Sequence, residues 1–309
     1  MSNPDLTVEI GDLKLKNPLT TASGTSGYGQ EVKDYYDPEI LGALTVKGLT
    51  VEPSGGNPVP RIVETPAGIL NSIGLENPGL NEFKAKEVER LGEFELPVIV
   101  NISGHSVEDY LILARQLATC DQISALEVNV SCPNIEGGGM AFGTNAEQVY
   151  RITRKIKEVY SQTVIVKLTP NVTDITEVAL AAEEAGSDSI SLINTLQGMA
   201  IDIHRQEPVL GNIFGGLSGP AVKPVALSMV YKAAGAVDIP VIGMGGIMSG
   251  ADALEFIMAG ASAVAVGTGA MVNPELMPKI IAEIENYLTE NRIKRVQDII
   301  GIAQKKGGK

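Results

Sequence analysis

Eight apolar segments, each followed by an amphipathic stretch, predict an α/β protein with the (β/α)8 architecture of a TIM barrel. The segments are rich in Val, Ile and Leu without strict alternation, which is typical of parallel strands buried on both faces. An open doubly wound sheet is the alternative, but no Gly-x-Gly-x-x-Gly fingerprint follows the first strand. The expected strands are 17–23, 43–50, 97–103, 125–131, 163–169, 189–195, 239–245 and 263–268.

The segments between these strands have the periodicity of helices. Val107, Tyr110 and Leu111 fall on one helical face. Ser249, followed three residues later by an acidic residue, is a typical start signal, and Gly186 is a typical stop. The alternation of strand and helix therefore continues along the chain.

Three regions do not fit the repeat. Residues 6–9 and 13–15 predict an N-terminal hairpin that plugs the bottom of the barrel, and 61–63 with 69–71 predict a second hairpin after strand two. Residues 201–217 form a long insertion after strand six. Long loops that follow barrel strands tend to build or cover the site, so we expect these inserts over the C-terminal mouth.

Composition excludes several classes of function. Lys plus Arg is 24 and Asp plus Glu is 37, so the net charge is −13, which disfavours binding to nucleic acid or anionic membranes. No apolar run is long enough to span a bilayer, and no signal peptide is evident, so we expect a cytoplasmic protein. Two cysteines, Cys120 and Cys132, cannot hold an iron–sulfur cluster, and His105 and His204 are isolated. We expect no metal site on this chain, and no linker or charge block divides residues 1–309 into two domains.

Nearly every expected strand ends in polar residues or glycine. Alone, each such residue is more often a turn or surface residue. In a barrel, however, the C-terminal strand ends meet at the mouth where catalysis occurs. From the first strand to the eighth, these residues are Ser23, Lys47, Asn101, Asn129 with Ser131 and Cys132, Lys167, Asn194 with Thr195, Gly245 with Gly246, and Gly267 with Thr268.

Two kinds of strand end indicate specific chemistry. The glycine-rich ends of strands seven and eight favour a phosphate site, because the absence of Cβ lets a phosphate approach the backbone. Lys47 and Lys167 could pair with an anion, form a Schiff base or stabilise a reduced cofactor, and position does not choose among these.

The segment Asn129-Val130-Ser131-Cys132-Pro133-Asn134 ends an apolar strand with a thiol, amides and a hydroxyl. Buried polar groups cost free energy unless they are paired, so the segment is typical of a site. Cys132 could be a base, a nucleophile or a packed apolar residue, whereas Cys120 has no polar cluster and is expected to be packed. The glycines at 137–139 could serve as hinges that let the loop close over a ligand.

The combined motifs resemble the class 1 dihydroorotate dehydrogenases, and most closely the NAD-linked class 1B catalytic subunit. The resemblance covers essentially the whole chain, and Gly138-Gly139-Met140-Ala141-Phe142-Gly143-Thr144 resembles class 1B rather than class 1A. The other matching motifs are Ala22-Ser23-Gly24, Val46-Lys47-Gly48, Asn71-Ser72-Ile73-Gly74-Leu75, the Asn129–Asn134 run, Val166-Lys167-Leu168, Ile193-Asn194-Thr195, Gly215-Gly216-Leu217-Ser218-Gly219, Gly245-Gly246 and Gly267-Thr268.

The resemblance implies one FMN-binding barrel domain that oxidises (S)-dihydroorotate to orotate in pyrimidine biosynthesis. Cys132 would remove the C5 proton while hydride leaves C6 for the flavin. Lys47, Asn71, Ser72, Ile73, Gly74, Leu75, Asn129, Asn194 and Thr195 would bind substrate. Ser23, Lys47, Gly48, Asn101, Asn129, Lys167, Ile193, Gly219, Gly245, Gly246, Gly267 and Thr268 would bind FMN, the last four residues holding its phosphate.

The resemblance also implies a partner. A dimer of this chain would join two subunits that carry FAD and a [2Fe–2S] cluster and pass electrons to NAD⁺. The alternatives are a fumarate-dependent class 1A-like enzyme, a related dihydropyrimidine dehydrogenase, a Schiff-base lyase that uses Lys47 or Lys167, and a non-catalytic flavin-binding scaffold.

Overall fold

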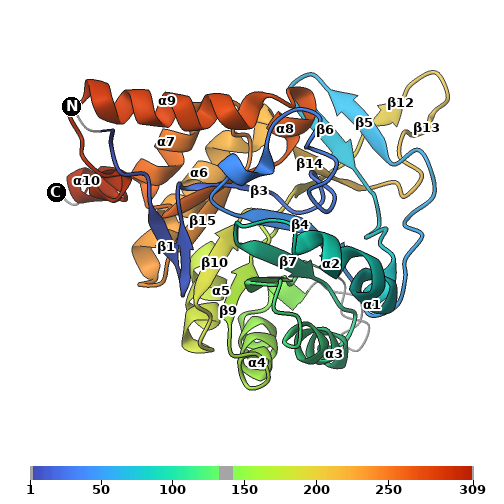
Figure 1. Cartoon of the computed structure of the whole chain (residues 1–309). Helices are drawn as coiled ribbons and strands as arrows, with labels where there is room; N and C mark the ends of the chain where they lie inside the picture. The colour runs from blue at the N-terminus through green and yellow to red at the C-terminus, as the bar shows by residue number, and fades with distance from the viewer. Residues whose placement is uncertain (1–2, 132–141, 308–309) are drawn as a thin grey trace.

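An eight-stranded parallel sheet forms the centre of the computed structural model, which describes residues 3–131 and 142–307 (Figure 1). All eight expected strands are confirmed, and each is shorter than its predicted range. The order around the sheet is β3 (Leu19–Thr21), β16 (Ala263–Val266), β15 (Val241–Met244), β10 (Ser189–Leu192), β9 (Thr163–Lys167), β8 (Ala125–Asn129), β7 (Val98–Ile102) and β4 (Leu44–Leu49).

Threonine side chains help to close this sheet into a barrel between its first and last strands. Thr20 and Ala43 form a single parallel bridge. Thr21 Oγ1 donates a hydrogen bond to the Thr45 carbonyl at 2.9 Å and accepts one from the Thr45 N–H at 2.9 Å. These contacts join β3 to β4, so the predicted barrel is confirmed.

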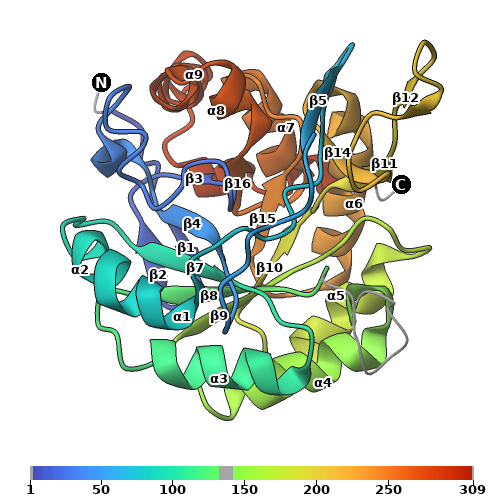
Figure 2. The same cartoon turned by 90° about the vertical axis from the view of Figure 1, so that its right-hand side faces the viewer.

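Helices cover the outside of the barrel (Figure 2). The predicted apolar face of the segment at 107–117 is buried, and Ser106 begins this helix with a reciprocal cap to Asp109. Ser249 caps a later helix, and Gly186 follows another helix with a φ of +93°, as expected of a stop. The helices are α3 (Val107–Leu117), α4 (Ala146–Lys157), α5 (Ile175–Glu184), α6 (Lys223–Ala236), α7 (Gly250–Ala259), α8 (Thr268–Val272), α9 (Leu276–Glu290) and α10 (Ile302–Gly307).

The chain segment between β6 and β7 contains a continuous helical run. It consists of α1 (Gly79–Glu82), the π-helical turn Phe83–Glu87 and α2 (Val88–Leu91). Two side chains of this run, Phe83 and Leu91, are fully buried in the core. Short 3-10 turns occur at Pro38–Ile40, Phe142–Thr144, Pro220–Val222 and Val296–Ile299.

The N-terminal hairpin lies at the bottom of the barrel, as predicted. Its strands are β1 (Val8–Ile10) and β2 (Leu13–Leu15), whose side chains alternate between buried and exposed. In the turn between them, the Asp12 N–H donates to Oγ1 of Thr163 at 3.2 Å. Thr163 is the first residue of β9, so the hairpin contacts the N-terminal end of the barrel strands.

The two insertions at the mouth pair with each other, which the sequence analysis did not predict. β5 (Ile62–Thr65) and β6 (Gly68–Asn71) join β14 (Gly215–Ser218) and β11 (Leu196–Gly198) in one antiparallel sheet (Figure 2). A further small hairpin consists of β12 (Ile201–Asp202) and β13 (Glu207–Pro208). The second sheet therefore brings the loop after strand two against the loop after strand six.

Residues that the sequence analysis set aside lie away from the mouth or on the surface. Cys120 is buried after α3, in agreement with a packed thiol. His105 is exposed in a bend at the mouth, where it contributes to the wall of the larger cavity, and His204 is exposed in a turn. In residues 3–131 and 142–307, no cluster of three His, Cys, Asp or Glu side chains could hold a metal ion, and no helix is long and apolar enough to cross a membrane.

Candidate active site

A cavity of about 1270 Å³ opens at the C-terminal mouth of the barrel. The strand ends of β4, β7, β8 and β9 contribute to its wall, together with the second sheet. The lining brings together side chains from several of the predicted strand ends, and the functions of these residues stay predictions. The predicted site residues in the wall are Ser23, Lys47, Gly48, Asn71, Ser72, Ile73, Gly74, Leu75, Asn101, Asn129, Lys167, Asn194 and Thr195.

Two strand-end amides are linked to each other at this wall. Asn194 Nδ2 lies 3.2 Å from Oδ1 of Asn129 and 2.9 Å from Oγ of Ser131, and both are hydrogen-bond acceptors for it. Asn129 Nδ2 in turn donates to Oγ of Ser103 at 3.0 Å. The hydroxyl of Tyr110, on α3, donates to the Asn129 carbonyl at 2.8 Å. The amides are therefore fixed in orientation before any ligand arrives.

Lys47 supplies a positive charge to the same cavity. It is half-buried near the C-terminal end of β4, and no carboxylate within residues 3–131 or 142–307 forms an ion pair with it. Ser72 has a buried hydroxyl oxygen without a hydrogen-bond partner in that part of the chain. An unpaired cation and an unsatisfied buried hydroxyl favour a ligand with anionic and polar groups.

Lys167 is bound to a buried carboxylate that the sequence analysis missed. Its Nζ lies 3.5 Å from Oε2 of Glu127 and donates to Oγ of Ser23 at 3.1 Å. Asn101 Nδ2 donates to the same Glu127 oxygen at 2.6 Å. The sequence does contain an indication of this carboxylate, because Glu127 lies in the middle of the apolar strand Ala125-Leu126-Glu127-Val128. Glu is rarely buried unless it is paired, so this position predicts a buried partner.

The predicted phosphate residues do not line the cavity of 1270 Å³. The loops that carry them do meet: a Cβ on Gly246 would lie 2.9 Å from the Gly219 carbonyl oxygen, and a Cβ on Gly219 would lie 3.5 Å from Cγ2 of Thr268. Thr268 Oγ1 donates to Oγ of Ser218 at 2.8 Å. Ile193, Gly219, Gly245, Gly246, Gly267 and Thr268 are thus absent from that lining but occupy neighbouring strand ends.

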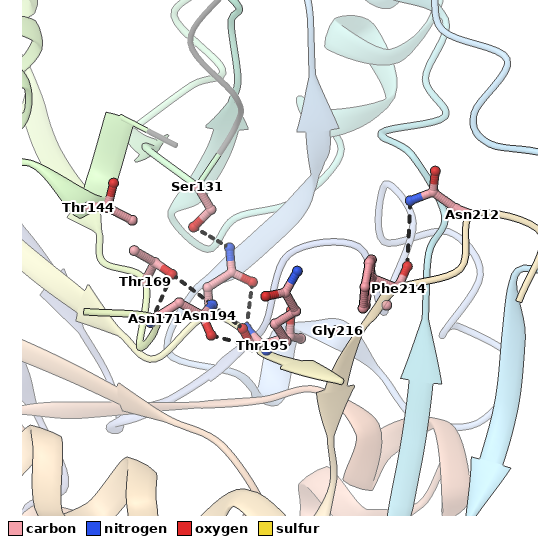
Figure 3. Close-up of a pocket in the computed structure, with 11 residues that line it drawn as sticks. Ser131, Thr144, Thr169, Asn171, Asn194, Thr195, Asn212, Phe214 and Gly216 are labelled. Carbon is pink, nitrogen blue, oxygen red and sulfur yellow. Dashed lines mark hydrogen bonds between the residues drawn. The ribbon is translucent and has the colours of Figure 1, made fainter. Parts of the chain in front are cut away.

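A smaller cavity of about 510 Å³ shares part of its wall with the first one, and Figure 3 shows the residues that line it. Ser131, Asn194, Thr195 and Asn212 line both cavities. The remaining wall comes from Thr144, Thr169, Asn171, Gln197, Phe214, Gly215 and Gly216. Asn171 Nδ2 donates to the Thr195 carbonyl at 3.2 Å. Most of this wall lies in the loops after strands five and six, and in these loops the strand-end analysis had identified only Asn194 and Thr195 among the residues that line it.

Cys132, Pro133 and Asn134, and the glycines at 137–139, lie outside the described residues. Ser131 is the last described residue before them, and it lines both cavities. The catalytic function of Cys132 therefore stays a prediction.

Comparison with known proteins identifies the family. The family model described as dihydroorotate dehydrogenase matches residues 5–288. The chain belongs to the dihydroorotate dehydrogenase family. This membership agrees with the resemblance that the strand-end motifs indicated.

Two relatives within the family cover nearly the whole chain. One, from Thermoanaerobacter pseudethanolicus, is 55% identical over 297 residues, which are 96% of this chain and 98% of the relative. Another, from Geobacter sulfurreducens, is 52% identical over 301 residues, or 97% of this chain and 99% of the relative. Both are described as the catalytic subunit of dihydroorotate dehydrogenase B (NAD⁺).

A solved structure supports the fold. The crystal structure of DHODH in complex with ferulenol from Eimeria tenella superposes with a TM-score of 0.82 and covers 98% of this chain and 89% of that one. The two sequences are 23% identical, so this likeness bears on the barrel fold alone.

Proposed function

We propose that this chain is the catalytic subunit of an NAD-linked dihydroorotate dehydrogenase and oxidises (S)-dihydroorotate to orotate in pyrimidine biosynthesis. Residues 1–309 would act as one FMN-binding barrel domain. Family membership and the two relatives support the reaction. The observation that carries the proposal at the site is the half-buried, unpaired Lys47 in one cavity with the linked amides of Asn129 and Asn194.

Dihydroorotate has the groups that this wall would recognise. Its carboxylate would pair with Lys47, and its ring amides would meet Asn71, Asn129 and Asn194. Asn71 is held beside β14 by a hydrogen bond from its Nδ2 to the Gly216 carbonyl at 3.3 Å. Oriented amides discriminate strongly, because an incorrect substrate leaves their donors and acceptors unpaired. The net charge of −13 makes a local lysine necessary for an anionic substrate.

The residues present fit FMN. The cavity of about 1270 Å³ exceeds the roughly 300–1000 Å³ usual for one ligand, so it has room for a ring system beside a small substrate. We propose that the neighbouring loops at Gly219, Gly246 and Thr268 hold its phosphate; at Gly246 (φ +77°) a Cβ would lie 2.7 Å from Cβ of Lys223, so the close approach of these loops requires glycine. Bound FMN would supply the hydride acceptor. Ser23, Asn101 and Lys167 would hold its ring from the barrel side.

Proton removal is assigned to Cys132. The thiol is placed in sequence directly after Ser131, whose hydroxyl accepts a hydrogen bond from Asn194. A base next to residues that orient the substrate would face a fixed C–H bond, which is the geometry that proton transfer requires. The alternative of a Schiff base at Lys167 is less well supported, because its Nζ is already held by Glu127 and Ser23.

The name "catalytic subunit" of the relatives implies a partner for those proteins. We propose that two copies of this chain join two subunits that carry FAD and a [2Fe–2S] cluster, and that the complex is cytoplasmic. The cysteine content supports this division of labour, because Cys120 and Cys132 cannot hold such a cluster. Electrons would then leave the barrel for NAD⁺ through the partner.

The test is an anaerobic titration of the purified chain with dihydroorotate, followed by acceptor assays. We expect a bound flavin that bleaches on addition of substrate, and NAD⁺ reduction that requires the partner subunit. A protein without flavin would support a lyase, and a flavin that dihydroorotate does not bleach would support a scaffold. Reduction by dihydrouracil instead would indicate a dihydropyrimidine dehydrogenase, and rapid turnover with fumarate a class 1A-like enzyme. Fast NAD⁺ reduction by the chain alone would contradict the proposed partner.

A further inference from the structure

A single carboxylate connects three strands inside the barrel. Glu127, in β8, is 3% exposed. Its Oε2 accepts from Asn101 Nδ2, in β7, at 2.6 Å and lies 3.5 Å from Lys167 Nζ, in β9. Its Oε1 accepts from the Ser191 hydroxyl, in β10, at 2.8 Å. The strand register places Asn101 opposite Glu127 and Ser191 opposite Lys167, and the contacts of Glu127 join the four side chains into one interior network.

The two carboxylate oxygens of Glu127 have partners in different places, one set at the cavity and the other in the barrel core. Both partners of Oε2, Asn101 and Lys167, line the cavity of 1270 Å³. Ser191, the partner of Oε1, is fully buried and does not line it. Apolar side chains usually fill this part of a barrel, and a buried ion pair generally stabilises a fold no better than apolar packing would. A function at the cavity therefore explains this network better than stability does.

We propose that Glu127 is a positioning residue that acts on bound FMN through Lys167. This inference rests on the FMN site proposed above. The carboxylate holds the ammonium and the Asn101 amide at the cavity wall, where Lys167 faces the flavin. An ammonium has three N–H donors, and in the described part of the chain Ser23 and Glu127 occupy two of them. The remaining donor is available to a ligand.

A fixed cation beside the flavin stabilises its anionic reduced form. Without the carboxylate, the ammonium would lose its charged partner and keep only neutral hydrogen-bond acceptors such as Ser23, so the cation would be held less firmly in place. The flavin would bind more weakly and would be harder to reduce. A carboxylate that served only the fold would change neither property.

The experiment measures two properties of the purified full-length chain: the dissociation constant of FMN from the flavin-free protein, and the midpoint potential of bound FMN. For Glu127→Gln we expect at least a tenfold larger dissociation constant. We also expect at least a tenfold shift of the redox equilibrium toward oxidised flavin, which is about 30 mV more negative for a two-electron couple.

Ser191→Ala is the matched control. It removes the bond to Oε1 and leaves both contacts of Oε2 intact. We expect its dissociation constant and redox equilibrium to stay within threefold of the wild type. Equal changes in Ser191→Ala and Glu127→Gln would overturn the proposal, because they would indicate a general loosening of the barrel.

A double variant tests whether Glu127 acts through Lys167. In the Lys167→Met background, adding Glu127→Gln should leave the potential unchanged, because the cation that Glu127 positions is gone. A full shift of the same sign in that background would show that Glu127 acts by a route other than Lys167, and a shift to a less negative potential would show a direct field from its charge; either would overturn the proposal. If Glu127→Gln does not fold, Glu127→Asp keeps the charge but withdraws it by one methylene. Weaker FMN binding would then support positioning, and unchanged binding and potential would refute it.

The outcomes separate this inference from the proposed function. A wild-type chain that binds no FMN would refute both. A wild-type chain that binds FMN and is reduced by dihydroorotate, with a Glu127→Gln variant that matches it in affinity and potential, would refute the positioning alone.

Discussion

Nδ2 of Asn194 lies 2.9 Å from Oγ of Ser131, so the segment after β10 is tied to the residue that directly precedes Cys132. The same nitrogen also reaches Oδ1 of Asn129 at 3.2 Å. One amide thus links two strand ends that meet at the cavity. Substrate recognition and the position of the proposed base should therefore depend on the same side chain.

Replacement of Asn194 by Ala should weaken the binding of orotate. The loss of a hydrogen bond that leaves a buried partner unsatisfied costs about 1–3 kcal/mol, which is roughly fivefold to a hundred-and-fiftyfold in the dissociation constant. Titration of the flavin absorbance with orotate would measure it. Asn171→Ala is the control, because Asn171 lines the smaller cavity but not the larger one. A similar loss in both variants would argue against a specific contact from Asn194.

Replacement of Cys132 by Ala should leave FMN bound but slow flavin reduction by dihydroorotate at least about a hundredfold, the usual scale for the loss of a general base. Anaerobic stopped-flow absorbance would measure the rate. Cys120→Ala is the matched thiol control, because Cys120 is buried after α3 and its thiol lies near the Gln116 carbonyl. Near-normal reduction in Cys132→Ala would remove Cys132 from the mechanism.

The convergence of the strand-end residues was predictable from sequence, because the carboxyl ends of parallel barrel strands meet at one mouth. Lys47, Asn101 and Lys167 illustrate this: each follows an apolar run, and each lines the cavity. The ends of helices were also predictable from sequence, because their signals depend on neighbouring residues alone. Ser249 and Gly186 begin and end helices for reasons contained within a few residues.

Contacts between distant segments were not predictable in the same way. β6 pairs with β14, which places Asn71 beside Gly216 across 145 positions of sequence, and hydrophobic periodicity contains no information on such a partner. The partners of Glu127 come from three different strands, so its charge could be noticed in the sequence but not explained. The two cavities likewise depend on how these loops pack.

Replacement of Lys47 by Met should weaken orotate binding about tenfold or more, because it removes the charge and keeps most of the length of the side chain. Pairing with a ligand carboxylate in a partly buried site is worth about 1.5–3 kcal/mol. The decisive comparison is with uracil, which lacks the carboxylate, and whose affinity should not change. Competition against bound orotate would measure both ligands.

The control for Lys47→Met is Lys14→Met, at an exposed position in the N-terminal hairpin at the barrel bottom, which should bind orotate like the wild type. An equal loss for orotate and uracil in Lys47→Met would contradict a carboxylate contact and would indicate a general change in the cavity.

Acid should remove a contribution to stability that Asp252 makes at the start of α7. Burial alone would raise the pKa of Asp252, but hydrogen bonds from Lys223 at 2.6 Å, from the Met248 N–H and from Ser249 hold that pKa below its usual value. A lowered folded-state pKa means that the contribution is fully present above the unfolded-state value of about 3.9 and is lost as the pH falls through the folded-state pKa.

Asp252→Asn should therefore lower the free energy of unfolding by about 1 kcal/mol at pH 7, and this difference should shrink as the pH falls below about 4. Urea unfolding at several pH values would measure it, with the exposed Asp121→Asn as the control. A difference that stayed constant from neutral to acid pH would show that the charge of Asp252 contributes nothing.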